Sequence, residues 1–193
     1  MNIREFSYNL QKLNEEITDT FSSFQSSTGW NCLSSCGRCC ITPDIEVGLF
    51  EMIPMALAIY DEGKLDEWIE KITSTDKSSC LAFIPSQKEG EGKCGRYKER
   101  PGLCRMFGVS GFRDKNNQVN LSICKFIKDQ YETKHIPEKI NQNEIPIMTN
   151  WSSKISTLDH GLDHKKLPIN LALLGALEKV AFYMQYQEPD SSQ

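Results

Sequence analysis

Cysteine is the residue type in this sequence whose number and spacing could do chemistry. The chain has eight cysteines, and four of them lie between Cys32 and Cys40, spaced as CxxxC, then CxxC, then a doublet. Thiolates are soft anionic donors that select zinc, copper(I) or iron–sulfur over magnesium or calcium. Short spacings let a chain wrap a small ion or cluster without closing a long loop. The run therefore predicts a metal centre.

All eight thiols are candidate ligands for metal. In an extended segment neighbouring side chains point in opposite directions, so Cys39 and Cys40 are not expected to bind the same tetrahedral ion. One of them would bind this centre, while the other packs or serves a second centre. The candidate ligands are Cys32, Cys36, Cys39, Cys40, Cys80, Cys94, Cys104 and Cys124.

A disulfide framework is the alternative interpretation, because an even number of cysteines also occurs in secreted domains. Three features count against it. The segment 1–6 lacks the apolar run of a signal peptide, a chain of 193 residues can bury a core without covalent links, and disulfides are rare in a reducing cytosol. We therefore expect metal binding and a cytoplasmic location.

Composition describes an ordinary water-soluble protein. Hydrophobic residues make up 39% and charged residues 25% of the chain, and the net charge is −4. This charge provides no field that attracts nucleic acid, and no apolar run has the roughly 18–20 residues that span a membrane. We expect neither nucleic acid nor membrane as a partner, and the sequence leaves a protein partner open.

The elements that must position the thiols begin with helices. Apolar residues recur at steps of three and four over residues 2–25, which predicts an amphipathic helix. Thr42-Pro43 resembles a helix start, which predicts a helix over 45–60 with a kink or break at Pro54. A further amphipathic helix is expected over 64–72.

Strands are expected in the cysteine-rich part, and an irregular arm after it. Segments 80–84 and 94–97 predict one hairpin, and residues 108–123, turning at 114–117, predict a second. The polar stretch 134–168 is expected to be an irregular arm, with His160 and His164 as loop residues rather than a zinc site. A last helix is expected over 169–187, with an apolar face of Leu171, Leu174, Leu177, Val180 and Met184.

These elements predict an α+β fold, mainly α, with helices around a small irregular cysteine-rich core that contains short β-hairpins. We expect one domain over 1–193. Its cysteine core would span about residues 28–128. The helix 2–25 and the arm and helix over 129–187 would pack on that core.

The cysteine pattern resembles a known family. Cys32-x3-Cys36-x2-Cys39-Cys40 is followed by Cys80-x-x-Phe83 and by Cys94-x-x-Tyr97-x-x-Arg100-Pro101-x-x-Cys104-Arg105-x-Phe107. Together they resemble the YkgJ-type cysteine-cluster family, also called the CxxCxxCC zinc- or iron-chelating domain, over roughly residues 28–128. The family name implies CxxC where this chain has CxxxC. The resemblance implies eight cysteine ligands and kinship with the cysteine domain of flagellin lysine N-methylases.

Arginines gather in the same stretch, since five of the six lie between Cys32 and Cys124. Thiolates on a divalent ion or a four-iron cluster leave a negative centre, and a nearby guanidinium offsets that charge and can donate hydrogen bonds to sulfur. We hypothesise that Arg100 and Arg105 have this role. An anion site and ordinary surface salt bridges are the alternatives.

Three functions remain open. The first is an iron–sulfur protein, with a 4Fe–4S cluster expected, that supports redox chemistry or a modification reaction. The second is a structural zinc-binding module without catalysis. The third is a thiol-redox protein active without metal. Zinc sites usually pair two CxxC motifs, and only one is present, which favours iron–sulfur. Membership of a methyl-transfer system would rest on analogy alone, so the sequence does not decide whether the protein is an enzyme.

Overall fold

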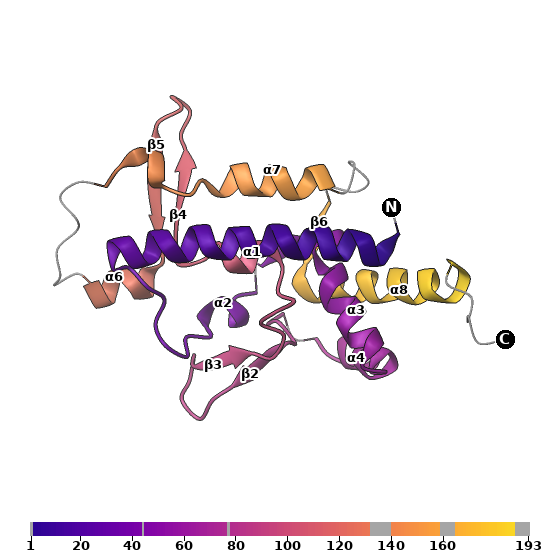
Figure 1. Cartoon of the computed structure of the whole chain (residues 1–193). Coiled ribbons are helices and arrows are strands. Elements are labelled where there is room, and N and C mark those ends of the chain that lie inside the picture. Colours follow the sequence, from indigo (N-terminus) through magenta and orange to yellow (C-terminus); the bar gives the residue numbers. More distant parts are fainter. Residues whose placement is uncertain (1, 44, 77, 132–139, 159–164, 188–193) are drawn as a thin grey trace.

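The computed structural model describes residues 2–43, 45–76, 78–131, 140–158 and 165–187. Within these ranges helices dominate, and the named strands form three short antiparallel pairs (Figure 1). The predicted α+β fold, mainly α, is confirmed. His160 and His164 lie outside the described residues. Among the helices described, none has both the length and the apolar character to cross a bilayer.

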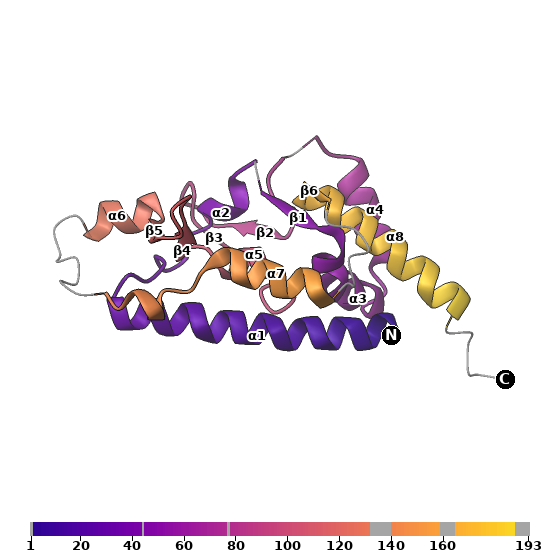
Figure 2. The same cartoon turned by 90° about the horizontal axis from the view of Figure 1, so that it is seen from above.

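Helix α1 (Ile3–Thr28) runs along most of the molecule (Figures 1 and 2). Asn2 caps it by accepting a hydrogen bond from the backbone N–H of Glu5 at 2.8 Å. Gly29 ends it at φ +75°, a conformation that glycine adopts without a steric penalty. The predicted apolar face is confirmed, because all its members are buried: Ile3, Phe6, Leu10, Leu13, Ile17, Phe21 and Phe24.

The predicted helix over 45–60 is wrong in its first half. Strand β1 (Glu46–Gly48) comes first and pairs with β6 (Lys166–Pro168), followed by the 3-10 helix η1 (Leu49–Met52) and α3 (Ile53–Asp61). Pro54 lies in the first turn of α3, where its missing N–H costs nothing, rather than at a kink. The strand depends on a partner far along the chain, which local spacing cannot reveal.

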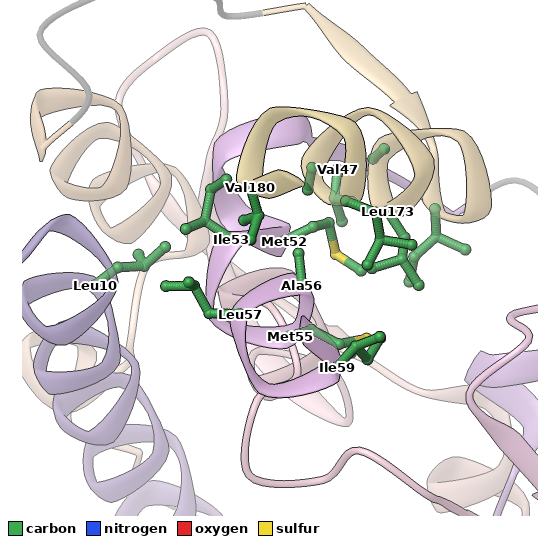
Figure 3. Packing of buried hydrophobic residues seen from close by; sticks show 14 of the residues in the cluster. Leu10, Val47, Met52, Ile53, Met55, Ala56, Leu57, Ile59, Leu173 and Val180 are labelled. Atoms are coloured by element: carbon green, nitrogen blue, oxygen red, sulfur yellow. The ribbon is translucent and has the colours of Figure 1, made fainter. Parts of the chain in front are cut away.

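The main hydrophobic core joins α1, α3 and α8 (Ile169–Gln187). Figure 3 shows Leu10 of α1 facing α3, and Leu173 and Val180 of α8 covering the other side of α3. The side chains of Leu10 and Ile53 are at most 1% exposed, and burying such a side chain contributes about 1.5–3 kcal/mol. Ala82 and Met106 from the cysteine-rich part belong to the same cluster.

The predicted bounds of α8 are confirmed, but its predicted apolar face is partly wrong. Leu171 is 51% exposed. The face that packs on the core consists of Ala172, Leu173, Ala176, Leu177, Val180 and Met184. Small alanines let α8 approach α3 closely, and a search for large apolar residues overlooks them.

A second cluster lies under the hairpin β4 (Val109–Arg113) and β5 (Val119–Ile123), which was predicted correctly. Its members are Phe24, Trp30, Val109, Ile127, Ile145 and Ile147. The stretch predicted as an irregular arm is wrong where it is described, since it contains η2 (Gln142–Glu144) and helix α7 (Met148–Leu158). Residues 134–139 and 159–164 of this stretch lie outside the described part. The single-domain organisation stays a prediction.

The remaining elements carry or flank the cysteines. They are α2 (Arg38–Ile41), α4 (Leu65–Thr73), β2 (Phe83–Pro85), β3 (Gly92–Cys94), α5 (Gly102–Arg105) and α6 (Lys125–Tyr131). The predicted helix over 64–72 is confirmed as α4. The predicted first hairpin is confirmed as β2–β3, but its strands lie closer to the turn than the predicted 80–84 and 94–97, and the return strand shares only Cys94 with the prediction.

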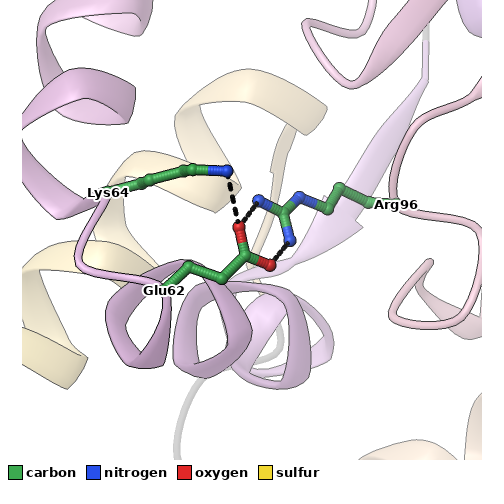
Figure 4. A network of polar contacts seen from close by, with 3 residues as sticks. All are labelled: Glu62, Lys64 and Arg96. Atoms are coloured by element: carbon green, nitrogen blue, oxygen red, sulfur yellow. Dashed lines mark hydrogen bonds and ion pairs between the residues drawn. The ribbon is translucent and has the colours of Figure 1, made fainter.

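A polar network fastens the cysteine-rich part to the helices (Figure 4). Arg96, two residues after Cys94, makes a two-pronged hydrogen bond to Glu62 between α3 and α4, and Lys64 adds an ion pair at 3.1 Å. Hydrogen bonds from Arg96 and then from Lys64 hold the pKa of Glu62 down at about 2. The guanidinium of Arg96 also lies 5.5 Å from the ring centre of Trp68.

Candidate metal centre

The first cysteine run is folded onto the β2–β3 hairpin. The N–H of Gly37 donates to the carbonyl oxygen of Gly90 at 3.0 Å, and the N–H of Gly92 donates to that of Ser35 at 2.8 Å. Cys36 also bridges Glu91 in an antiparallel arrangement. These backbone bonds fix the knuckle that carries Cys36, Cys39 and Cys40 against the segment that leads to Cys94.

Two side chains lock this contact. The ring of Phe83 lies against Gly37, where an added Cβ would be 2.2 Å from its Cε2 atom, and against Gly92. Arg38 extends from α2 past Gly90 to the ring of Phe126, whose centre is 4.9 Å from the guanidinium carbon. Phe126 follows Cys124 by two residues, so Arg38 links the knuckle to the last cysteine. No role was predicted for Arg38 or Phe83, although Phe83 belongs to the cysteine pattern of the family.

Four thiols form what we call the Cys124 group: Cys32, Cys36, Cys39 and Cys124. Burial raises the pKa of Cys39 to about 11, and the charges of the other three members add to the increase. Cys32 and Cys124 meet at Gly108. The position of an added Cβ there is 2.9 Å from the sulfur of Cys32, and the carbonyl oxygen of Gly108 accepts from the N–H of Cys124 at 2.7 Å.

The other four thiols form the Cys104 group: Cys40, Cys80, Cys94 and Cys104. Burial raises the pKa of Cys40 to about 12, with further increases from Cys80 and Cys94. Burial also raises the pKa of Cys104, and the charges of the other three members act in the same direction. The backbone brings the members together, since the N–H of Cys80 donates to the carbonyl oxygen of Cys40 at 2.8 Å and Cys94 lies opposite Phe83 in the hairpin.

The doublet is therefore divided between the groups, because Cys39 interacts mainly with one and Cys40 with the other. A divergence of Cys39 and Cys40 was predicted for an extended segment. The doublet lies in the helix α2, not in an extended segment. Successive residues of a helix are also far apart around its axis, since a turn takes 3.6 residues, so the two thiols diverge there too.

Backbone amides are aimed at two sulfurs of the Cys104 group. The N–H groups of Ala82 and Phe83 bond to the side chain of Cys80, and that of Arg96 bonds to Cys94. Burial is the largest influence on both thiols and raises their pKa, while these bonds lower it. N–H groups directed at sulfur stabilise a thiolate and tune a bound centre.

All eight thiols are free. As the side chains stand, no three or more His, Cys, Asp or Glu residues in the described ranges are arranged to hold one metal ion. A zinc ion would need the sulfurs of a group to lie about 3.8 Å apart, the edge of a tetrahedron with Zn–S bonds of about 2.3 Å. The donor set of each group, four soft thiols, nevertheless fits zinc or iron.

Residues 31–125 match the family CxxCxxCC, described as "Putative zinc- or iron-chelating domain". This segment belongs to the CxxCxxCC family. The CxxCxxCC segment begins one residue before Cys32 and ends one residue after Cys124, so it includes both thiol groups. The family's description supports binding of zinc or iron. No curated protein and no solved structure matches the chain, so kinship with flagellin lysine N-methylases stays a prediction.

The two arginines predicted to accompany the CxxCxxCC thiols are placed differently. Arg105 donates to the carbonyl oxygens of Arg100 and Lys98 and, at 2.8 Å, to the hydroxyl of Thr18, so its guanidinium serves the backbone around α5. Arg100 stacks on Tyr97, 3.9 Å from the ring centre, and its charge lowers the pKa of Cys104 against the larger effects of burial and neighbouring thiols.

Proposed function

We propose that the protein is an iron–sulfur protein with two four-thiolate centres, one held by the Cys124 group and one by the Cys104 group. The observation that carries the proposal is the separation of eight thiols into two sets of four. Each set gathers thiols from separate parts of the chain, and one cysteine of the Cys39-Cys40 doublet goes to each. Four thiolates are the usual ligand set of a [4Fe–4S] cluster.

Two features favour a cluster over zinc. Only one CxxC is present, whereas structural zinc sites usually use two. The charges of the other members of each group raise the pKa of Cys39 or of Cys40, yet no three of the described side chains are arranged to hold a single ion. A four-iron cluster is wider than an ion and holds its thiolates farther apart.

The residues of the chain would have the following roles at these centres. The eight cysteines bind, and the amides of Ala82, Phe83 and Arg96 donate to sulfur. When bound, an iron–sulfur cluster supplies one-electron redox chemistry. Eight free thiols suit a reducing compartment, which supports the cytoplasm as the location.

A structural zinc protein is the second candidate. The turn after Cys80, where two successive amides point at one sulfur, is favourable for any metal thiolate, zinc included. In that case each group would hold one zinc ion and the centres would stabilise the fold without redox chemistry.

Metal analysis of anaerobically purified protein tests the proposal. We expect brown protein with broad visible absorption and, for two four-iron clusters, about eight iron and eight sulfide per chain. Colourless protein with two zinc ions per chain would overturn the iron–sulfur proposal and support the second candidate. Protein that takes up neither metal after anaerobic reconstitution would overturn both.

A further inference from the structure

Arg100 is a half-buried cation, and its buried Nε–H is an unused donor. Among the residues that the structure describes, its Nε is the only buried arginine nitrogen without a hydrogen-bond partner. The guanidinium is held by the Tyr97 ring at 3.9 Å. The backbone is held too, because Nε of Arg105 donates to the carbonyl oxygen of Arg100 at 3.1 Å. A buried N–H that lacks a partner destabilises the folded protein, so an acceptor for this N–H would be stabilising.

The other arginines of the cysteine-rich part have different contacts. Arg96 is bonded to Glu62, Arg105 to two carbonyl oxygens and Thr18, and Arg113 to the carbonyl oxygen of Asn117. Arg38 lies over the ring of Phe126. Among these arginines, Arg100 is the one with a buried donor that remains available to a metal-binding thiolate.

The charge of Arg100 also acts on both thiol groups. Its charge attracts Cys32 of the Cys124 group, and it attracts Cys40, Cys94 and Cys104 of the Cys104 group. It lies in the chain between Cys94 and Cys104, after the hairpin and directly before Pro101 and α5. The charge of one guanidinium thus acts on thiols of both sets.

We propose that Arg100 is a shared counter-cation for both centres, stacked on Tyr97 with its Nε–H directed at a metal-bound thiolate. The proposal rests on the proposed function, since the acceptor is a thiolate held by metal. Each four-thiolate centre with a divalent ion carries a net charge of about −2, and a single positive charge between the centres favours the loaded form of each. Arg105 positions Arg100 through the bond that it donates to the Arg100 carbonyl oxygen, and its charge also lowers the pKa of Cys94.

The test uses cobalt(II), a coloured probe for tetrahedral thiolate sites, added anaerobically to the full chain in competition with a chelator. Cys124→Ser leaves the Cys104 group to be measured alone, and Cys104→Ser leaves the Cys124 group. In each background Arg100→Gln is expected to weaken cobalt binding by about 10- to 100-fold, the usual effect of losing a hydrogen-bonding neighbour of a metal ligand. Arg100→Lys keeps the charge but not the planar donor, so it should lose less cobalt affinity than Arg100→Gln.

Arg113→Gln is the matched control, because it removes the same charge from the β4–β5 turn, where the guanidinium bonds to Asn117. It should leave cobalt affinity unchanged in both backgrounds. Equal affinities for Arg100→Gln and Arg113→Gln would overturn the proposal, as would a loss confined to one group. The circular dichroism spectra of the cobalt-free variants must match that of the cobalt-free parent protein. If Arg100→Gln is unfolded, the cobalt affinity of Arg100→Lys tests the proposal by the same criteria. If neither background of the otherwise unchanged chain takes up cobalt or, after anaerobic reconstitution, iron and sulfide, the proposed function fails instead.

Discussion

Serine substitutions at Cys39 and Cys40 give the sharpest test of two separate centres. The two residues are adjacent in α2 and differ little in burial. Serine is nearly the same size as cysteine, but its hydroxyl is a harder and much weaker donor for soft metals. Each substitution should therefore remove one ligand without disturbing the helix.

The number of centres that each variant should keep follows from the thiol group to which the substituted cysteine belongs. Cys39 interacts with Cys124, and Cys40 with Cys80 and Cys94. Either single variant should fall from two centres per chain to about one, since three thiolates do not complete a structural site. Cys39→Ser combined with Cys124→Ser should also keep one centre, because both residues belong to the same group. Cys39→Ser combined with Cys104→Ser should keep none.

The assay is metal and sulfide content per chain after anaerobic reconstitution, with visible absorption as the second readout. Cys39→Ser and Cys40→Ser should give similar contents but spectra from different centres, and these two spectra should add up to that of the unchanged protein. The reasoning is refuted if the Cys39/Cys124 double variant loses both centres, or if the Cys39/Cys104 double variant retains one.

Two further predictions concern the contacts that hold the site. Gly37→Ala places a methyl group 2.2 Å from Cε2 of Phe83, so urea unfolding of the metal-loaded protein should show a loss of about 1–3 kcal/mol. Gly48→Ala, with φ −70° and its nearest atom at 3.5 Å, should instead be neutral or gain about 0.4–1 kcal/mol, and a similar loss in both would contradict the prediction. Glu62→Gln removes a carboxylate whose pKa is held at about 2 by Arg96 and Lys64, below its ordinary 4.5, so its stabilising effect is complete above pH 4.5 and disappears as pH falls toward 2. The difference in Tm between the two proteins should shrink over that range, metal loss being common to both, and a difference independent of pH would show that the charge of Glu62 is not involved.

Short-range sequence patterns correctly predicted the helices and strands that depend on short-range contacts. The face of α1, the helix α4 and the β4–β5 hairpin depend on residues close in the chain, and all three were predicted. Strand β1 could not be predicted, because its partner β6 lies more than 100 residues later and the segment 45–60 that contains β1 is apolar enough to be taken for one helix. Helix α7 was missed because only Ile155 is buried along it, which leaves little periodicity to detect.

The candidate ligands could be found from the sequence, but their grouping could not. Spacing groups Cys39 with Cys40, whereas helix α2 and the bond from Cys80 to Cys40 assign Cys40 to cysteines far along the chain. Arg100 and Arg105 looked equivalent as neighbours of Cys104. Only the hydrogen bonds of Arg105 to carbonyl oxygens and the unused Nε of Arg100 separate them.

The position of Cys104 depends on residues outside the CxxCxxCC segment. It lies in α5, which begins at Gly102, and Gly102 is wedged against Ile17 of α1 and Ile155 of α7. An added Cβ at Gly102 would be 2.5 Å from Cδ1 of Ile155, so only glycine lets α5 approach both helices this closely. Met106, at the end of α5, is 1% exposed in the core that α1 shares with α3 and α8. The flanking helices therefore position one thiol of the Cys104 group, and a fragment limited to residues 31–125 would lose the packing that holds it.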